Sequence, residues 1–260
     1  MVDLQQRIEQ FHRDGYLIIP DVLSRDEVVN LREGVERAFA KTDEEAELYH
    51  MPDMWRPRMF EHGEAFEALV DHPGIIDLIE ALLDSTCHLI ANSALRTLPG
   101  RGISSWHADE TIRFPLPRDV PLDSRIQMPC FVINLNYYLC DVDEELGPTQ
   151  FVPTSHRSGR NPEDEDRDEE GNPFYLDNGV VSALSKAGTC VMWHDQIWHR
   201  GAPNQSKDRI RWVLQAPYAR RFISQRFYPF INYRMPEGIL EHATPRRKRL
   251  LGLHTPGAYG

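Results

Sequence analysis

The chain lacks a long apolar run. Although 41% of its 260 residues are hydrophobic, no segment approaches the roughly 20 consecutive apolar residues of a membrane-spanning helix. The opening segment, MVDLQQRIEQFHRDGYLIIP, carries charges throughout and has no apolar stretch typical of a secretion signal. We therefore expect a cytoplasmic globular protein without a membrane anchor, with enough apolar side chains for a sizeable core.

Cysteine and positive charge are both scarce. Without any C-x-x-C pair and next to apolar stretches, the cysteines read as buried free thiols of a reducing compartment; they are Cys87, Cys130, Cys140 and Cys190. The net charge of −11 argues against a nucleic-acid partner. One basic run, at 246–249, is expected to be the solvated face of a final helix.

The order of patterns along the chain predicts helices first and strands afterwards. Apolar residues recur at helical spacing near the start, and again after the capping-box pair Ser24 and Glu27, with a short strand at 16–20 between them. A third helical segment, about 66–83, is interrupted by a Pro-Gly turn. From there the pattern changes to short strands separated by turns, in segments 88–98, 128–139, 149–156, 188–193 and 210–218.

We therefore expect a single domain that is mainly β with flanking helices. No repeat of fixed period is found, and the strands do not alternate with full helices, so a jelly-roll core is favoured over a doubly wound sheet. Residues 1–87 would form a helical N-terminal layer, 88–220 the β core and 221–260 a C-terminal extension. Two loop insertions are expected, at 111–125 and in the acidic run 161–171, which lacks the ligand spacing of a calcium-binding loop.

Metal-ligand chemistry is indicated by the motif SSWHADE. His107 and Asp109 are two residues apart, so on an extended strand both side chains leave by the same face and can reach one ion. A third ligand is available from the run GTCVMWHDQIWHRGAPNQS, which offers His194 and His199. Two imidazoles and one carboxylate on one face leave three octahedral positions open, as in iron(II) oxygenases. A zinc isomerase or hydrolase on a similar barrel would use the same ligands.

Polar residues in two apolar strands suggest a bound carboxylate. Arg209 and Arg211 lead into the strand RWVLQ, where a buried guanidinium could form two parallel hydrogen bonds with the distal carboxylate of 2-oxoglutarate. Asn134 and Asn136 are two apart in the strand FVINLNYYL, and burying them is costly unless a partner satisfies them. A bound co-substrate would be such a partner.

Several ordered segments resemble the phytanoyl-CoA dioxygenase family of Fe(II)/2-oxoglutarate oxygenases. They are FHRDGYLIIPDVLS, WHAD, LCDVDEELGPTQFVPTSHRSG, AGTCVMWHDQIWHRGAPNQS and RRKRLLGLH, which together span nearly the whole chain. The resemblance implies a cupin-like, double-stranded β-helix core. It also implies His107, Asp109 and His199 as the metal ligands, because the family's distal histidine opens the stretch that leads to Pro-Asn-x-Ser.

The resemblance also assigns roles to residues around the metal. His194 becomes structural or a support for the ligands, and His156 structural. An arginine shortly after the distal histidine would anchor 2-oxoglutarate; counting from His199 favours Arg209, whereas counting back from Val-Leu-Gln favours Arg211, which we prefer. Positions that touch the co-substrate in the family correspond to Asn136 and Thr149, with Asn134 beside them.

The activity implied is hydroxylation of a small molecule by Fe(II), 2-oxoglutarate and dioxygen, with release of succinate and CO2. A carboxylate at Asp109 favours hydroxylation over halogenation, for which related enzymes carry a small residue there. The alternatives are the non-redox metalloenzyme and a pseudoenzyme that only binds a ligand. We expect a monomer or homodimer and no nucleic-acid or membrane partner. Arginines within or next to the segments 111–125 and 222–233 hint at an anionic or amphipathic substrate, although packing and solvation of the barrel rim is the preferred explanation; they are Arg113, Arg118, Arg221 and Arg226.

Overall fold

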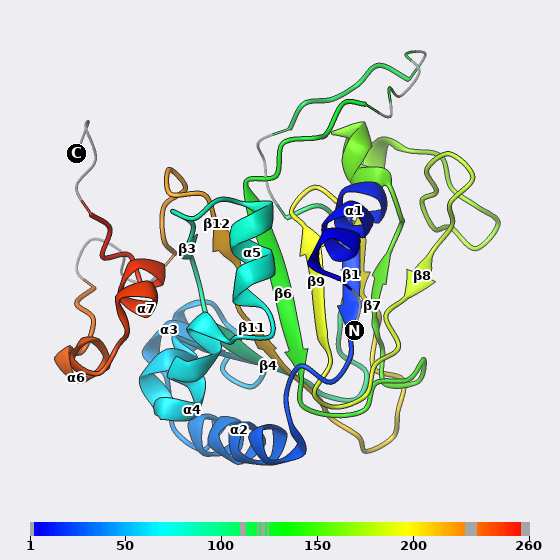
Figure 1. Ribbon diagram of the computed structural model, residues 1–260. Helices are drawn as coiled ribbons and strands as arrows, with labels where there is room; N and C mark the ends of the chain where they lie inside the picture. Colours follow the sequence, from blue (N-terminus) through cyan, green and yellow to red (C-terminus); the bar gives the residue numbers. More distant parts are fainter. Residues whose placement is uncertain are drawn as a thin grey trace.

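Two antiparallel sheets form the centre of the molecule (Figure 1). The computed structural model describes residues 3–109, 113–118, 120, 123, 125–226 and 233–255. The larger sheet has the strand order β1 (Tyr16–Ile19), β9 (Cys190–His194), β6 (Val132–Tyr138), β11 (Arg211–Gln215), β4 (Ser93–Thr97) and β2 (Trp55–Pro57), and β12 (Tyr218–Ala219) joins β6 to β3 (His88–Leu89). The smaller sheet has the order β5 (Ile103–His107), β10 (His199–Gly201), β7 (Thr149–Phe151) and β8 (Val181–Ser182).

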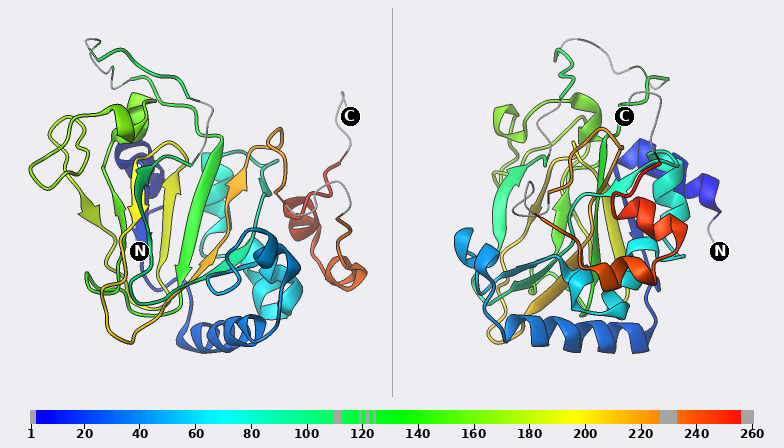
Figure 2. Two further views of the ribbon diagram at one scale, coloured as in Figure 1. Left: turned by 180° about the vertical axis from the view of Figure 1, so that it is seen from behind. Right: turned by 90° about the vertical axis from the view of Figure 1, so that its left-hand side faces the viewer.

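Helices from the first third of the chain pack on the outer face of the larger sheet (Figure 2). They are α1 (Leu4–Asp14), α2 (Arg25–Phe39), α4 (Glu64–Glu67) and α5 (Ile76–Leu82), with short 3-10 turns at Met59–His62 and Ala68–Asp71. The short helix α3 (Glu44–Leu48) instead contacts β2 at the end of the sheet. Two more 3-10 turns, Ser155–Ser158 and Pro162–Asp164, follow β7, and α6 (Glu237–Glu241) and α7 (Pro245–Leu250) end the described chain. The predicted mainly β fold with flanking helices is confirmed.

Alternation along β6 separates the core from the future site. Ile133, Leu135 and Tyr137 belong to the apolar cluster that faces the helices. Asn134 and Asn136 point to the other side, into the space between the sheets, because successive side chains of a strand leave by opposite faces. The helical layer therefore buries one face of the larger sheet and leaves its inner face available for polar residues.

Three sequence predictions need correction. The segment 1–87 contains a second strand besides the one predicted at 16–20, which is β1: it also supplies β2, at the other end of the larger sheet's strand order. Segment 88–98 is two strands, β3 and β4, and not one. Asp109 does not share a strand with His107, because β5 ends at His107. The loop insertion 111–125 lies partly outside the described residues.

The basic run at 246–249 forms helix α7, as predicted, but it is docked and not solvated. Arg246 and Arg249 donate hydrogen bonds to Glu80 on α5, and Arg247 pairs with Asp71 at 2.7 Å. All four residues of the run are half-buried. The C-terminal helix is therefore held to the body of the domain by ion pairs.

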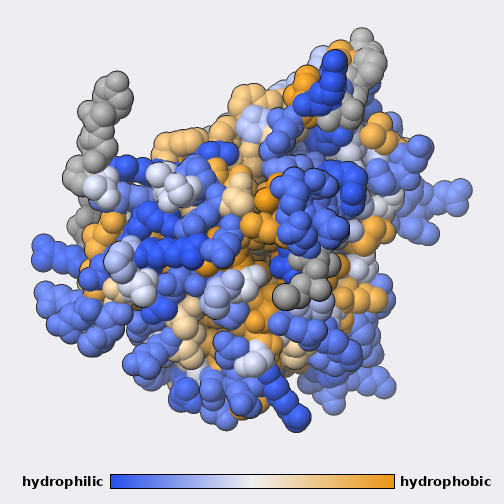
Figure 3. All heavy atoms as spheres, in the orientation of Figure 1, coloured by the Kyte–Doolittle hydropathy of each residue, from blue (hydrophilic) through white to orange (hydrophobic). Residues whose placement is uncertain are grey.

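In the view of Figure 3 most of the surface is hydrophilic, with smaller apolar areas between the polar side chains.

Leu250 provides the first testable prediction. It is fully buried in the main apolar cluster at the end of α7, so Leu250→Ala should lower the free energy of unfolding by about 2–5 kcal/mol. Urea denaturation should still give one cooperative transition, since α7 shares the core of the domain. The control Lys248→Ala, on the same helix but half-exposed, should change stability by less than about 0.5 kcal/mol. A separate early transition would contradict a single domain.

Candidate metal centre

His107 and His199 lie directly opposite each other in the smaller sheet. β5 and β10 pair antiparallel, and the register places the Cα of His199 against that of His107. Their ring centroids are 4.3 Å apart, the separation expected of side chains on the same face of a cross-strand pair. Antiparallel pairing therefore brings together two imidazoles that are 92 positions apart in the sequence.

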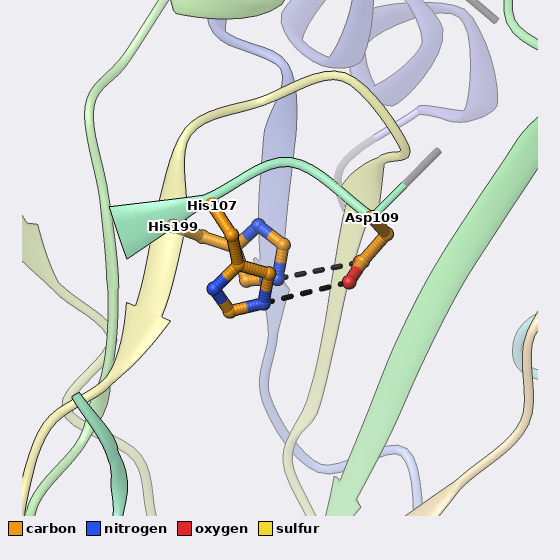
Figure 4. Close-up of side chains that lie close together, drawn as sticks. All are labelled: His107, Asp109 and His199. Carbon is orange, nitrogen blue, oxygen red and sulfur yellow. Dashed lines mark ion pairs between the residues drawn. The ribbon is translucent and has the colours of Figure 1, made fainter. Parts of the chain in front are cut away.

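Backbone carbonyls orient both imidazoles. Nδ1 of His107 lies 2.9 Å from the carbonyl oxygen of Ser105, and Nδ1 of His199 lies 3.0 Å from that of Ile197. A carbonyl only accepts, so each Nδ1 carries the hydrogen and each Nε2 keeps a free lone pair. The two Nε2 atoms lie 3.6 and 3.3 Å from the carboxylate oxygens of Asp109 (Figure 4).

Asp109 is held from the larger sheet. Its Oδ2 accepts hydrogen bonds from Nδ2 of Asn134 at 2.7 Å and from Nε1 of Trp193 at 3.0 Å. Asn134 and Trp193 are themselves opposite each other in the β6–β9 ladder. The Asp109 N–H donates to the carbonyl of Asp195 at 3.0 Å. The carboxylate thus bridges the two sheets. Its Oδ2 is fixed by two donors and also faces Nε2 of His199, while its Oδ1 faces Nε2 of His107.

The electrostatics of this cluster favour a bound cation. Burial alone would raise the pKa of Asp109, but the imidazoles of His199 and His107 hold it well below its usual range. Conversely, a hydrogen bond donated to the Asp109 carboxylate raises the pKa of His107. The ligand atoms of the three residues lie within 4.8 Å of one another. The two imidazole lone pairs, 3.6 and 3.3 Å from the carboxylate oxygens, are close enough to share one ion with bonds of about 2.1 Å.

A cavity of about 510 Å³ opens beside the cluster. All three candidate ligands line it, as do Arg211 and Asn136. Further lining residues are Tyr49, Met51 and Trp55 near the β2 edge, Gln215 of β11, and Arg226 from the segment after β12. The cavity therefore joins the metal candidates to one buried cation and to an aromatic rim, as small-molecule sites commonly do.

Arg211 is an unpaired cation inside this cavity. It is 7% exposed and inward-facing on β11, and burial lowers its pKa. Its guanidinium donates to Oγ1 of Thr97 at 3.1 Å and to the carbonyl of Ala202 at 3.5 Å, and no carboxylate in the described part of the chain pairs with it. Because a buried guanidinium without an anion is costly, a carboxylate ligand would complete the site.

Arg209 lies elsewhere. Strand β11 begins only at Arg211, so the two arginines do not share a strand face. Arg209 forms ion pairs with Asp143 at 2.9 Å and Glu145 at 2.6 Å on the surface. It does not line the cavity, and of the two predicted anchors the geometry favours Arg211.

The other residues predicted to contact the co-substrate also line the cavity, but their hydrogen-bond partners differ. The hydroxyls of Thr149 and Tyr138 are hydrogen-bonded to each other at 2.7 Å. Asn136 is buried, and its Oδ1 has no hydrogen-bond partner within the described residues. Asn134, predicted as a co-substrate contact, instead donates to Asp109. Asn136 therefore presents an unsatisfied acceptor at a position where a ligand in the cavity could reach it.

Sequence reasoning missed Trp193 and Thr97. Trp193 alternates with Met192 along β9 and faces inward, so the strand pattern could have found it. Thr97 becomes informative only through its register opposite Arg211 in the β4–β11 ladder. Of the predicted rim arginines, Arg226 lines the cavity, whereas Arg118 pairs with Asp166 at 3.5 Å. The segment 227–232 lies outside the described residues.

Asn134 gives a prediction for the metal centre. Asn134→Leu removes one of the two donors to Oδ2 of Asp109, and loss of such a supporting contact should weaken Co(II) or Mn(II) binding by about 10–100-fold. Asn136→Leu is the matched control, because Asn136 is on the same face of the same strand and bonds no ligand. Titration of both variants with metal alone tests this. Equal affinities would show that Asn134 does not position Asp109.

Comparison with known proteins adds sequence relatives. A family model described as phytanoyl-CoA dioxygenase (PhyH) matches residues 11–212. Dioxygenase FrzG of a Cladobotryum species is 23% identical over 235 residues, which cover 83% of this chain and 74% of FrzG. Dioxygenase cdmD of Talaromyces verruculosus is 24% identical over 159 residues, or 60% of this chain. The match spans less than half of cdmD, 46% of its length.

Solved structures show the same fold. HygX from Streptomyces hygroscopicus, crystallised with nickel and 2-oxoglutarate, superposes with a TM-score of 0.62 at 16% identity, over 84% of this chain and 88% of HygX. The epimerase SnoN, in complex with Fe3+, alpha ketoglutarate and nogalamycin RO, gives a TM-score of 0.60 at 20% identity, over 84% of each chain. The likeness confirms the predicted jelly-roll core. With the family match covering most of the sequence, the chain belongs to the phytanoyl-CoA dioxygenase family.

Proposed function

We propose that this protein is an Fe(II)/2-oxoglutarate-dependent dioxygenase that hydroxylates a small molecule. One observation carries the proposal: an open His107–Asp109–His199 cluster shares a cavity with Arg211, a buried cation that lacks an anion. The facial triad would bind the metal, and the arginine would bind the carboxylate of a co-substrate. HygX with nickel and 2-oxoglutarate and SnoN with Fe3+ and alpha ketoglutarate support this choice of ligands.

His107, Asp109 and His199 would hold the iron. With 2-oxoglutarate and dioxygen, bound Fe(II) supplies an oxidant for a C–H bond as the co-substrate is decarboxylated to succinate and CO2. The protein's part is to keep ligands deprotonated and fixed: the Ser105 and Ile197 carbonyls set the imidazole tautomers. The two donors to Asp109 set its carboxylate plane. No acid or base from the chain is needed.

Arg211 would bind the distal carboxylate of 2-oxoglutarate. Two parallel N–H donors match the two carboxylate oxygens and fix the direction of the co-substrate in the cavity. Gly201 leaves room for this arrangement, since an added Cβ would stand 3.3 Å from Nη2 of Arg211. Asn136 lines the same cavity and can donate through its amide nitrogen. Thr149 would shape the wall through its bond with Tyr138.

The rim of the cavity favours a substrate with apolar surface. Tyr49 and Trp55 pack edge to face with ring centroids 5.6 Å apart, and Met51 lies beside them in the cavity lining. Arg226 adds a cation to the same lining. We therefore propose an amphipathic small molecule as substrate, with its apolar part against the aromatic pair.

The test is an assay for coupled consumption of oxygen and 2-oxoglutarate. Protein reconstituted with Fe(II) under anaerobic conditions should form succinate only when dioxygen and 2-oxoglutarate are both then supplied. In a screen of metabolites, the substrate should increase the rate of succinate formation. Turnover with zinc in the absence of dioxygen would instead support the isomerase or hydrolase. Ligand binding without any turnover would support the pseudoenzyme.

Mass spectrometry of the product separates two outcomes. Hydroxylation adds one oxygen atom to the substrate, whereas an epimerisation leaves its mass unchanged. The resemblance in fold to the epimerase SnoN makes epimerisation the second candidate. A product of unchanged mass but altered retention on a chiral column would replace hydroxylation by epimerisation.

A further inference from the structure

A second group of ligand-type side chains lies on the opposite face of the larger sheet. Cys130, His194 and Asp195 offer ligand atoms that lie within 4.8 Å of one another. Along β9, Val191 and Trp193 face the interior between the sheets, so His194 faces the helices, where its ring stacks on Phe11 of α1 at 6.1 Å. This group, the Cys130 cluster, is therefore separate from the metal centre.

The Cys130 cluster is completely buried and poorly satisfied. Cys130 is 3% exposed, His194 1% and Asp195 0%. Both carboxylate oxygens of Asp195 and Nε2 of His194 lack a hydrogen-bond partner within the described residues. A buried carboxylate without hydrogen bonds costs several kcal/mol, and native proteins rarely leave such a group uncompensated. Something that the side chains do not supply must therefore satisfy it.

A proton on Nδ1 of His194 does not resolve the problem. Nδ1 lies 2.8 Å from Oδ1 of Asp195, as in an ion pair. However, the backbone N–H of Gln196 donates to the same Nδ1 at 3.1 Å, so this nitrogen presents a lone pair and not a hydrogen. Two acceptor atoms then face each other at close range, and a cation between or beside them removes the repulsion.

We propose that Cys130, His194 and Asp195 bind a divalent metal ion of the zinc type. Thiolate, imidazole and carboxylate are the ligands zinc prefers, at about 2.0–2.3 Å, and one thiolate and one carboxylate neutralise its charge within the apolar surroundings. The soft thiolate distinguishes this site from the N/O ligands of the metal centre. This inference does not depend on the proposed function.

The site would hold the turn that presents the catalytic ligands. Asp195 starts the turn between β9 and β10 that ends at His199, and its carbonyl accepts the N–H of Asp109. Fixing the Asp195 side chain therefore fixes the backbone next to two of the three candidate iron ligands. We expect a structural ion, because the cluster is buried and does not line the catalytic cavity.

Cobalt spectroscopy tests the proposal. In the double variant His107→Ala/His199→Ala the metal centre is removed, so bound Co(II) reports on the Cys130 cluster. We expect one equivalent of Co(II) with a thiolate-to-cobalt charge-transfer band, displaced by Zn(II). Adding Cys130→Ser should abolish the band, whereas Cys140→Ser, the control at a half-buried thiol, should leave it unchanged.

The outcome is decided even when a variant does not fold. The parent protein can be titrated directly, because the metal centre has no sulfur ligand and cannot give the thiolate band. Folded protein, checked by near-ultraviolet circular dichroism, that shows no thiolate band at saturating Co(II) overturns the proposal. A proton shared between His194 and Asp195 would then be the occupant. If the parent protein shows the thiolate band but no oxygenase activity, only the proposed function is contradicted and the second metal site stands.

Discussion

Replacing His199 by alanine should abolish the formation of succinate from 2-oxoglutarate. His199 supplies one of the two imidazole Nε2 atoms that face Asp109, and no other histidine of the described chain lies in the cavity lining except its cross-strand partner His107. Loss of contacts that merely support a ligand costs about 10–100-fold, so loss of the ligand itself should exceed roughly 100-fold. Succinate formation and oxygen uptake measure this.

The matched control is His242→Ala, at the exposed end of α6. It should keep the parent rate and the parent thermal midpoint. Co(II) titration of His199→Ala should show weaker binding at the metal centre while the circular dichroism spectrum stays that of a folded protein. Parent-level succinate formation by His199→Ala would mean that the metal is held elsewhere, and the facial triad would be wrong.

The two candidate histidine ligands could be predicted because each lies in a motif of its own. WHAD and the stretch after His199 could be compared with a family without knowledge of the fold. How His107 and His199 meet could not be derived, since the β5–β10 register depends on pairing between distant segments. Asp109 was expected on the strand of His107 but lies beyond its end, tied to β6 and β9 by Asn134 and Trp193.

The helical layer and the long strands could also be predicted from the sequence, whereas the short strands could not. Ser24 caps α2 and accepts from the N–H of Glu27, as the capping box predicts. β2 has three residues and ends in Pro57, too short for an alternating pattern and unfavourable as a strand by itself. It forms because β4 pairs with it at the sheet edge. Tertiary pairing, and not local preference, decides such strands.

The start of β11 separates two arginines that the sequence left as alternatives. Arg209 and Arg211 are two apart and would share a strand face if the strand began early. The chain before Arg211 instead follows the turn in which Asn204 accepts from the N–H of Ser206 and donates to the carbonyl of Arg209. Arg209 is therefore directed to the surface carboxylates, and Arg211 alone enters the cavity.

Arg211→Met should weaken 2-oxoglutarate binding without weakening the fold. Removing one partner of a buried charge pair costs about 2–5 kcal/mol, or at least roughly 30-fold in affinity. Stability of the unliganded protein should stay the same or increase, because an unpaired buried cation is replaced by an apolar side chain of similar length. Titration of the Fe(II) protein with 2-oxoglutarate, followed by its charge-transfer absorption, gives the affinity, and thermal unfolding gives the stability.

Two companion variants separate this role from a general effect of charge. Arg209→Met removes an arginine two residues away but outside the cavity, and should leave the affinity for 2-oxoglutarate unchanged. Arg211→Lys keeps the charge but loses the planar pair of donors, so it should recover little of the affinity. If Arg211→Met binds 2-oxoglutarate like the parent protein, or if Arg209→Met is the weaker binder, the anchor is not Arg211. A loss of affinity confined to the Arg211 variants, together with unchanged or higher stability, is what a cation awaiting a carboxylate should give.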